Sequence, residues 1–431
     1  MKILSYGMRG PQVQLLQLAL QRAGFSAGAA DGIFGPNTLR ALRRFQESRG
    51  LVADGIAGRA THAALRPWYT GYLSHILRPG DSFYRLAMAY GTSVAAIAAA
   101  NPGQDPLNLT VGAAVTVPLP FEVVPTTIDW CSELVAFCCD GISRRYPFVS
   151  LGSIGESVMG RPLWRLTMGN PEENRVLYNA AHHANEWITT PLLLRFTEEL
   201  ARAYAFDLEI FGKNARSLLS ETALAVIPCV NPDGLDLVTG DLNSGAYFDA
   251  ARIIAESYPA IPFPSGWKAN IRGTDLNLQY PAGWVNAREV KFAQGFTGPA
   301  PRDYVGTAPL SAPESRAMYD YTRSYSPALT LSYHTQGEVI YWKYLNFDPP
   351  RAAEIAGIFS AASGYAVETT PYASGFAGYK DWFIQDYNRP GFTIEAGLGE
   401  NPLPIRDLPK IYRDNLGILT SGLAVFSDVF V

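Results

Sequence analysis

Apolar runs of strand length alternate with amphipathic stretches from Phe121 to Val431, and this alternation limits the possible folds more than any other feature of the chain. Such runs are typical of strands that lie inside a sheet covered by helices. The four candidate strands are 176–178, 223–227, 328–333 and 391–394. We therefore predict an α/β domain over 121–431, large enough to be an enzyme, with functional side chains just beyond the carboxyl ends of its strands.

A repeated turn precedes this domain. The letters DGIFG at 31–35 return 23 residues later as DGIAG at 54–58, and apolar residues recur on one helical face before each copy. Each copy predicts an Asp-Gly turn followed by a capped helix, so residues 1–68 should form a small three-helix bundle. The pattern resembles the peptidoglycan-binding domain of bacterial wall hydrolases. A helical bundle that binds no ligand is the alternative interpretation.

A second small module is predicted over 71–120. It contains HILRPGDSF at 75–83, Asn-Pro at 101–102 and a closing VTVP at 115–118. The periodicities predict the order strand, helix, helix, strand. As a set, these segments resemble a lysin motif, a small α+β module (LysM), and the resemblance implies binding to the N-acetylglucosamine chains of peptidoglycan or chitin.

Histidines are few in this chain, and two of them stand beside an acid. The α/β domain holds His182, His183 and His334, and the segment AHHANEW at 181–187 places Glu186 three residues after His183. This spacing lets one imidazole and one carboxylate bind the same metal ion, and a catalytic Zn²⁺ typically takes three protein ligands and a water. We predict that His183, Glu186 and His334 are the ligands and that His182 is packed behind them.

The same segment resembles the zinc metallocarboxypeptidase family, and further matches follow in the family's order through 128–431. They are GES and GRP within 155–162, VNPDG at 230–234, GTDLN at 273–277, His334, and FTIE at 392–395. The resemblance implies a mixed sheet flanked by helices, one zinc ion on the three predicted ligands, and Glu395 as the general base. A carboxylate in that role takes a proton from the attacking water and passes it to the leaving amine.

A cation that stabilises the oxyanion is also expected. Arg272, just before the GTDLN segment, is the first choice and Lys268 is the second. For the mobile active-site tyrosine of the family we predict Tyr372, which stands directly before Ala-Ser-Gly, one position closer than in the family. Tyr379 is the alternative.

Three departures from the family pattern indicate an altered substrate. The family's exopeptidases clamp a terminal carboxylate with an Asn and the Arg that follows it, whereas here Asn277 is followed by Leu278. Asn185 stands where the family has an Arg inside the zinc-binding segment, and Gln336 stands where it has a Tyr. An apolar side chain cannot pair with a carboxylate. We therefore expect Asn277, Leu278, Tyr372 and Gln336 to contact a substrate other than an ordinary peptide C-terminus.

The two modules and the altered site together resemble the gamma-D-glutamyl-L-diamino acid endopeptidases of spore-forming bacteria. This resemblance implies cleavage between gamma-D-Glu and meso-diaminopimelate or Lys, with peptidoglycan glycan and stem peptides as partners. One alternative is a zinc carboxypeptidase that trims ordinary peptides and uses another arginine as its clamp. The other is a non-catalytic wall-binding protein, against which the intact zinc ligands and base argue.

Composition and charge exclude several other classes. Hydrophobic residues make up 48% and charged residues 17%, so the chain can bury a large core and is not disordered. Residues 1–70 carry nine Lys and Arg against three Asp and Glu, which suits an anionic polymer. Because these basic residues lack interleaved aromatic side chains, we expect no nucleic-acid binding. No apolar run is long enough to span a membrane, so no membrane partner is expected.

Location is predicted from the cysteines and the first residues. The four cysteines, at 131, 138, 139 and 229, contain no CxxC pair and are expected to be reduced. Residues 1–7 lack the apolar core of a secretory signal. We therefore expect a cytoplasmic or spore-associated protein that acts on cell wall material. Nothing in the sequence indicates an oligomeric state.

Overall fold

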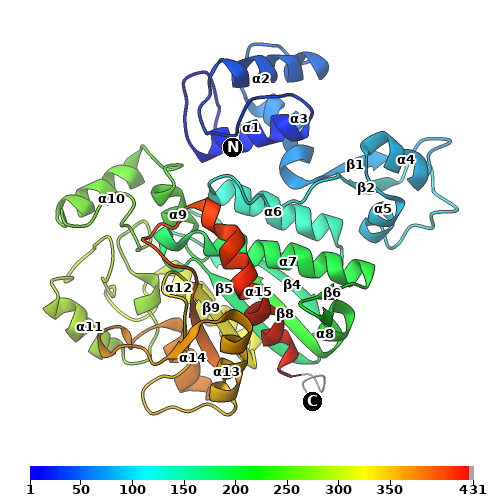
Figure 1. The fold of residues 1–431 in the computed structure, drawn as a ribbon. Helices are drawn as coiled ribbons and strands as arrows, with labels where there is room; N and C mark the ends of the chain where they lie inside the picture. The colour runs from blue at the N-terminus through cyan, green and yellow to red at the C-terminus, as the bar shows by residue number, and fades with distance from the viewer. Residues whose placement is uncertain (427–431) are drawn as a thin grey trace. The chain divides into compact units, whose positions relative to one another are not determined.

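The computed structural model describes residues 1–426. The chain divides into two compact units, Met1–Leu151 and Gly152–Val431. The first unit contains both small predicted modules, and it also contains residues 121–151, which the sequence analysis assigned to the enzyme domain. Figure 1 labels the helices and some of the strands.

Three helices begin the first unit. They are α1 (Pro11–Arg22), α2 (Pro36–Ser48) and α3 (Arg59–Thr70). The two repeated turns are held in the same way, because Gln17 Nε2 donates to Asp31 Oδ1 at 2.9 Å and Gln46 Nε2 donates to Asp54 Oδ1 at 3.0 Å. The predicted three-helix bundle is confirmed, and its repeat corresponds to two equivalent hydrogen-bonded turns.

The second small module follows α3 directly, and the chain leaves it close to the point where it enters. Its elements are β1 (Tyr72–Ile76), α4 (Phe83–Tyr90), α5 (Val94–Ala100) and β2 (Ala114–Pro118). The strands are antiparallel, with Tyr72 opposite Pro118, and Leu119 N donates to Gly71 O at 2.8 Å. The chain therefore enters and leaves the module at one place, and the predicted order of elements is confirmed.

Helix α6 (Ser132–Arg145) also belongs to the first unit. Phe137 stacks on Tyr69 of α3, with ring centroids 5.0 Å apart. A Cβ on Gly141 would collide with the backbone oxygen of Thr70, so glycine is required for this close approach. The helical core of the first unit thus includes α6, which lies in the range that the sequence analysis assigned to the enzyme domain.

An eight-stranded mixed sheet forms the second unit, in the order β11-β10-β12-β9-β5-β8-β4-β3. The strands are β3 (Ser150–Glu156), β4 (Pro162–Gly169), β5 (Asn174–Ala180), β8 (Thr222–Ile227), β9 (Leu329–His334), β10 (Val339–Tyr341), β11 (Ala366–Glu368) and β12 (Gly391–Glu395). The neighbours β12, β9, β5 and β8 run parallel, whereas β10 and β4 beside them are antiparallel. These four parallel strands are the four candidate strands of the sequence analysis, so the predicted α/β fold and mixed sheet are confirmed.

Helices cover both faces of this sheet (Figure 1). Helices α7 (Thr189–Phe206) and α15 (Leu408–Ala424) pack on one face, where Tyr178 OH donates to Leu419 O at 2.8 Å. On the other face lie α12 (Pro313–Tyr325) and α14 (Tyr379–Tyr387), and there Leu177 shares a buried cluster with Met318 and Trp382. Because successive side chains of a strand point to opposite faces, adjacent residues of β5 contact the two helical layers.

The second unit contains both the helices that cover the sheet and shorter peripheral elements. Its helices are α7 (Thr189–Phe206), α8 (Ala215–Glu221), α9 (Pro232–Val238), α10 (Ala246–Glu256), α11 (Trp284–Ala293), α12 (Pro313–Tyr325), α13 (Ala352–Ser363), α14 (Tyr379–Tyr387) and α15 (Leu408–Ala424). Its 3₁₀ turns are η1 (Ala184–Glu186), η2 (Leu276–Leu278), η3 (Tyr372–Ser374) and η4 (Ile405–Asp407), and β6 (Glu209–Ile210) pairs with β7 (Lys213–Asn214). Through residue 426, no helix combines the length and apolar character needed to cross a bilayer.

Candidate active site

A cavity of about 660 Å³ lies in the second unit at the carboxyl ends of three parallel strands. Strand β5 leads through a turn at Ala181, where φ is 54°, to His183 and the 3₁₀ turn η1. Strand β9 ends at His334 and β12 ends at Glu395, and these two residues stand opposite each other in the parallel pair. Functional side chains therefore gather where strand ends of an open α/β sheet meet.

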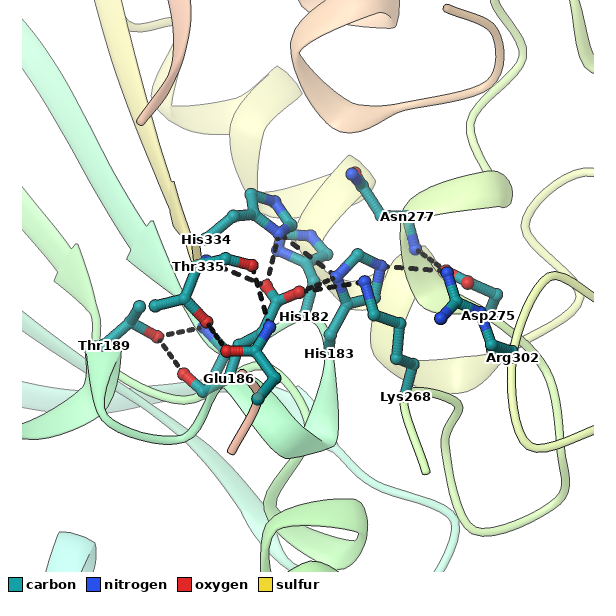
Figure 2. Close-up of polar contacts among 12 residues, drawn as sticks. His182, His183, Glu186, Thr189, Lys268, Asp275, Asn277, Arg302, His334 and Thr335 are labelled. Carbon is teal, nitrogen blue, oxygen red and sulfur yellow. Dashed lines mark hydrogen bonds and ion pairs between the residues drawn. The ribbon is translucent and has the colours of Figure 1, made fainter. Parts of the chain in front are cut away.

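The three predicted metal ligands form one cluster (Figure 2). Glu186 Oε1 lies 2.9 Å from His183 Nδ1, and Glu186 Oε2 lies 2.8 Å from His334 Nδ1. The two Nδ1 atoms are 3.2 Å apart. Ligands about 2.1 Å from a tetrahedral ion are separated by roughly 3.4 Å, so this set of two imidazoles and one carboxylate fits a single zinc ion.

Asp275 holds the opposite side of the His183 ring. His183 Nε2 donates to Asp275 Oδ1 at 3.1 Å, which leaves Nδ1 free to bind a metal when the ring is neutral. Asp275 Oδ2 in turn accepts from the backbone N–H of Asp303 at 3.1 Å. The sequence analysis gave Asp275 no role. The sequence did contain an indication of such a role, because Asp275 is an acidic residue inside the GTDLN segment and stands close to the predicted substrate contact Asn277.

Charge in the cluster favours a cation. Burial opposes ionisation of Glu186, but the charges of His183, Lys268 and His334 outweigh burial and hold the pKa of Glu186 well below its ordinary value. Burial also opposes protonation of His183, yet Glu186 and Asp275 raise its pKa to about 9. An imidazole that prefers positive charge here shows that the local field favours a bound metal cation.

Glu395 lines the cavity beside the cluster. Burial raises the pKa of its carboxyl, with a further contribution from the negative charge of Glu186. A carboxylate with a raised pKa is a stronger base toward water, which suits the role that the sequence analysis assigned to it.

His182 belongs to the core and not to the cluster. Its side chain is fully buried, and its Nε2 lies 2.9 Å from the hydroxyl of Tyr280. Burial holds the pKa of His182 well below its ordinary value, so the ring is neutral. The packed position expected for it is the one observed.

The cation beside the cluster is Lys268, the second choice, whereas Arg272, the first choice, lies outside the cavity. Lys268 Nζ lies 3.1 Å from Glu186 Oε1, and burial of this amine is outweighed by Glu186, which raises the Lys268 pKa. Arg272 is exposed and does not line the cavity. The reason is a tight turn in which Arg272 N and Thr274 N both donate to Asn270 Oδ1, leaving the arginine side chain in solvent.

Three of the predicted substrate contacts line the cavity: Asn277, Leu278 and Gln336. Asn277 Oδ1 accepts from Tyr379 N at 2.9 Å, which orients the amide. Leu278 is 8% exposed and packs into the apolar cluster under the cavity. The wall is therefore apolar at the position where the family's exopeptidases carry their arginine.

Neither candidate tyrosine lines the cavity. Tyr372 is exposed on η3 and contacts Phe376 edge to face, while its neighbours Pro371 and Ser374 reach the cavity wall. Tyr379 is fully buried, and its hydroxyl lies 3.0 Å from Thr322 Oγ1. Burial of Tyr379 removes it as an alternative, because a side chain fixed in the core cannot swing onto a substrate.

Comparison with known protein families gives three matches. Residues 136–417 match the zinc carboxypeptidase family. Residues 9–65 match a peptidoglycan binding domain, and residues 75–118 match the LysM domain. These ranges coincide with the two N-terminal modules and with most of the α/β domain.

Individual relatives agree with these matches. The chain is 44% identical over 284 residues to gamma-D-glutamyl-L-diamino acid endopeptidase 1 of Lysinibacillus sphaericus, covering 65% of this chain and 69% of that protein. Among solved structures, carboxypeptidase A from Helicoverpa armigera aligns with a TM-score of 0.52 at 16% identity, covering 96% of this chain and 95% of that one. Bovine thrombin-activatable fibrinolysis inhibitor aligns with a TM-score of 0.53 at 20% identity, covering 69% and 97%. At such identities the structures establish the fold alone.

Proposed function

Because the chain belongs to the zinc carboxypeptidase family and is a zinc metallopeptidase, we propose that it cleaves the bond between gamma-D-Glu and the diamino acid of peptidoglycan stem peptides. The observation that carries this proposal is Leu278, an apolar residue in the cavity wall. The name of the Lysinibacillus relative supports the same bond, and the two N-terminal domains suit a substrate in the cell wall.

Each residue of the site has a distinct role in the proposed reaction. His183, Glu186 and His334 would hold the zinc ion, which when bound lowers the pKa of water and polarises a carbonyl. Glu395 accepts the proton of the attacking water and delivers it to the leaving amine. Lys268, beside the cluster, balances the negative charge that develops on the carbonyl oxygen. Asp275 keeps the His183 ring oriented throughout.

Leu278 favours an endopeptidase over an exopeptidase. A peptidase that removes one terminal residue recognises the terminal carboxylate, for which a guanidinium clamp is the efficient partner. In a stem peptide the diamino acid is commonly followed by another residue, so the enzyme must accept an amide at that position. An apolar wall tolerates this group, whereas a buried arginine would be left without its partner.

The wall-binding domains suit an insoluble substrate. We infer that the LysM module binds glycan strands and thereby holds the catalytic unit near the stem peptides attached to them. Tethering of this kind raises the local substrate concentration, to about the mM range for short linkers.

The test uses the full-length protein loaded with zinc and two peptides, L-Ala-gamma-D-Glu-meso-diaminopimelate and the same peptide extended by D-Ala on the diaminopimelate, with products identified by mass. We expect release of L-Ala-gamma-D-Glu from both by the parent protein and not by Glu395→Gln. An ordinary peptide of standard amino acids serves as the control substrate. Loss of its C-terminal residue, with the gamma-glutamyl bond of both peptides left intact, would contradict the proposal and identify a carboxypeptidase.

A further inference from the structure

The guanidinium of Arg302 lines the cavity, and only one of its nitrogens is hydrogen-bonded to the part of the chain that the structure describes. Its side chain is 43% exposed, so solutes can reach it. Its Nε donates to Asp303 Oδ2 at 2.6 Å. Within residues 1–426 neither of its terminal nitrogens has a hydrogen-bond or ion-pair partner. A guanidinium has five N–H donors, so the face best suited to grip a carboxylate in bidentate fashion is available.

Arg302 shares its ion-pair partner with a second cation. Among residues 1–426, Asp303 pairs with Arg302 and also with Lys291, whose Nζ lies 2.7 Å from Asp303 Oδ1. Two cations therefore share a single carboxylate, while the other nearby carboxylates, Asp275 and Glu186, are engaged by His183 and Lys268. An anionic group of a substrate would complete the balance.

The loop that carries Arg302 is fixed to the metal-binding cluster by backbone hydrogen bonds. Pro301 O accepts from Lys268 N at 2.8 Å, and Tyr304 O accepts from Asp275 N at 2.9 Å. Asp303 N donates to Asp275 Oδ2, and Asp275 Oδ1 holds His183. Such a rigid arrangement is what precise placement of a substrate group requires.

Arg302 also lies next to the cation assigned to the reacting carbonyl. Figure 2 shows it beside Asp275, on the same side of the cluster as Lys268. The two are close enough for the charge of Arg302 to oppose protonation of Lys268. A substrate whose scissile carbonyl lies at Lys268 thus places groups close to that carbonyl within reach of Arg302.

A gamma-linked glutamate differs from an ordinary peptide residue on the acyl side of the scissile bond. Its alpha-carboxylate is free and stands only a few carbon atoms from the scissile carbonyl, whereas an ordinary peptide has no charge there. Resting on the proposed function, we propose that Arg302 binds the free alpha-carboxylate of the gamma-D-Glu residue and so selects the gamma linkage.

Three peptides test this assignment with the full-length, zinc-loaded protein. The reference is L-Ala-gamma-D-Glu-meso-diaminopimelate. The second peptide carries a primary amide in place of the glutamate alpha-carboxylate, and the third carries one in place of the carboxylate adjacent to the scissile nitrogen. For the parent protein we expect kcat/KM to fall roughly 10- to 100-fold on amidation of the glutamate.

The variants locate the effect. In Arg302→Gln the reference-to-glutamate-amide ratio of kcat/KM should fall to about 1, while the ratio for the third peptide stays as in the parent. Arg302→Lys, which keeps the charge but lacks the fork, should keep an intermediate ratio. The matched control is Arg316→Gln, an exposed arginine on α12, with thermal unfolding measured for each protein.

Two results would overturn the assignment and differ from each other. If Arg302→Gln keeps the parent's discrimination against the glutamate amide, Arg302 does not bind that carboxylate. If it loses discrimination only against the third peptide, Arg302 is the substitute clamp of a carboxypeptidase-like site. If the parent protein cleaves none of the three peptides, the proposed function itself is wrong. The assignment of Arg302, which rests on that function, is then wrong as well.

Discussion

His183 Nε2 lies 3.1 Å from Asp275 Oδ1, while Nδ1 of the same ring lies 2.9 Å from Glu186 Oε1. One ring nitrogen is thus anchored, and the other faces the metal-binding cluster. Because Asp275 also accepts from Asp303 N, a single carboxylate links a metal ligand to the loop that carries Arg302. The geometry of metal binding and that of substrate binding therefore depend on the same residue.

Asp275→Asn should weaken zinc binding about 10- to 100-fold, because the asparagine no longer fixes the tautomer and orientation of His183. Competition with a chelator, followed by metal content and by Tm, measures this change. Excess zinc should restore much of the lost activity. Unchanged zinc affinity in Asp275→Asn would show that the hydrogen bond does not position the ligand.

Glu395→Gln should lower kcat by about 10²- to 10⁴-fold, because the amide cannot accept a proton from water. Its zinc content should equal that of the parent, since Glu395 lies beside the cluster and is not one of the three grouped ligands. Metal analysis and steady-state kinetics on the same preparation separate the two effects. Loss of zinc together with activity would make Glu395 a ligand instead of a base.

Lys268 and Arg272 differ in position and should differ in effect. Lys268→Gln should lower kcat/KM roughly 10²-fold, since it removes the charge 3.1 Å from Glu186 at the reacting centre. Arg272→Gln should change kcat/KM by less than about twofold, because this side chain is exposed outside the cavity. Equal losses in both variants would contradict the placement of the oxyanion cation.

The LysM module can be removed without opening the rest of the first unit. Tyr72 and Pro118 are opposite one another, and Leu119 N is bonded to Gly71 O, so a short Gly-Ser linker can replace 72–118. We expect digestion of intact peptidoglycan to slow at least tenfold, with soluble muropeptide cleaved at about the parent rate. Equal slowing on both substrates would exclude tethering as the role of the module.

Glu314 should make the second unit less stable as the pH rises. This buried carboxyl accepts from Val158 N and Asn270 Nδ2, both at 3.1 Å, and burial raises its pKa from 4.5 to about 7. Between those values the folded state binds more protons than the unfolded chain, so the free energy of unfolding falls with rising pH. Relative to Glu314→Gln, the parent should lose about 3 kcal/mol from pH 4.5 to pH 8. A constant difference between the two proteins in denaturant unfolding would show that Glu314 titrates normally.

The sequence pattern predicted the strands in the middle of the sheet and missed those at its edges. Strands β5, β8, β9 and β12 lie in the middle of the sheet with helices on both faces. They are largely buried, and each carries enough apolar residues to be visible in the sequence, with β8 the most continuous run. The outer strands β3, β4, β10 and β11 are partly exposed, carry mixed polarity and were not among the candidates. The contacts of α6 with α3 are long-range and likewise have no local signature in the sequence.

The order of the modules, the parallel core of the sheet and the grouping of His183, Glu186 and His334 could be predicted from the sequence, because histidines are scarce in this chain and His183 and Glu186 stand at metal-ligand spacing. The role of Glu395 was implied by the family resemblance and stays a prediction. Which cations face the cavity became visible in the folded structure alone. Lys268 replaced Arg272, and Arg302 and Asp275 gained roles, because these residues lie on loops whose course is set by hydrogen bonds between distant segments. Local propensity does not encode the direction of a side chain on such a loop, so its position follows from the fold as a whole.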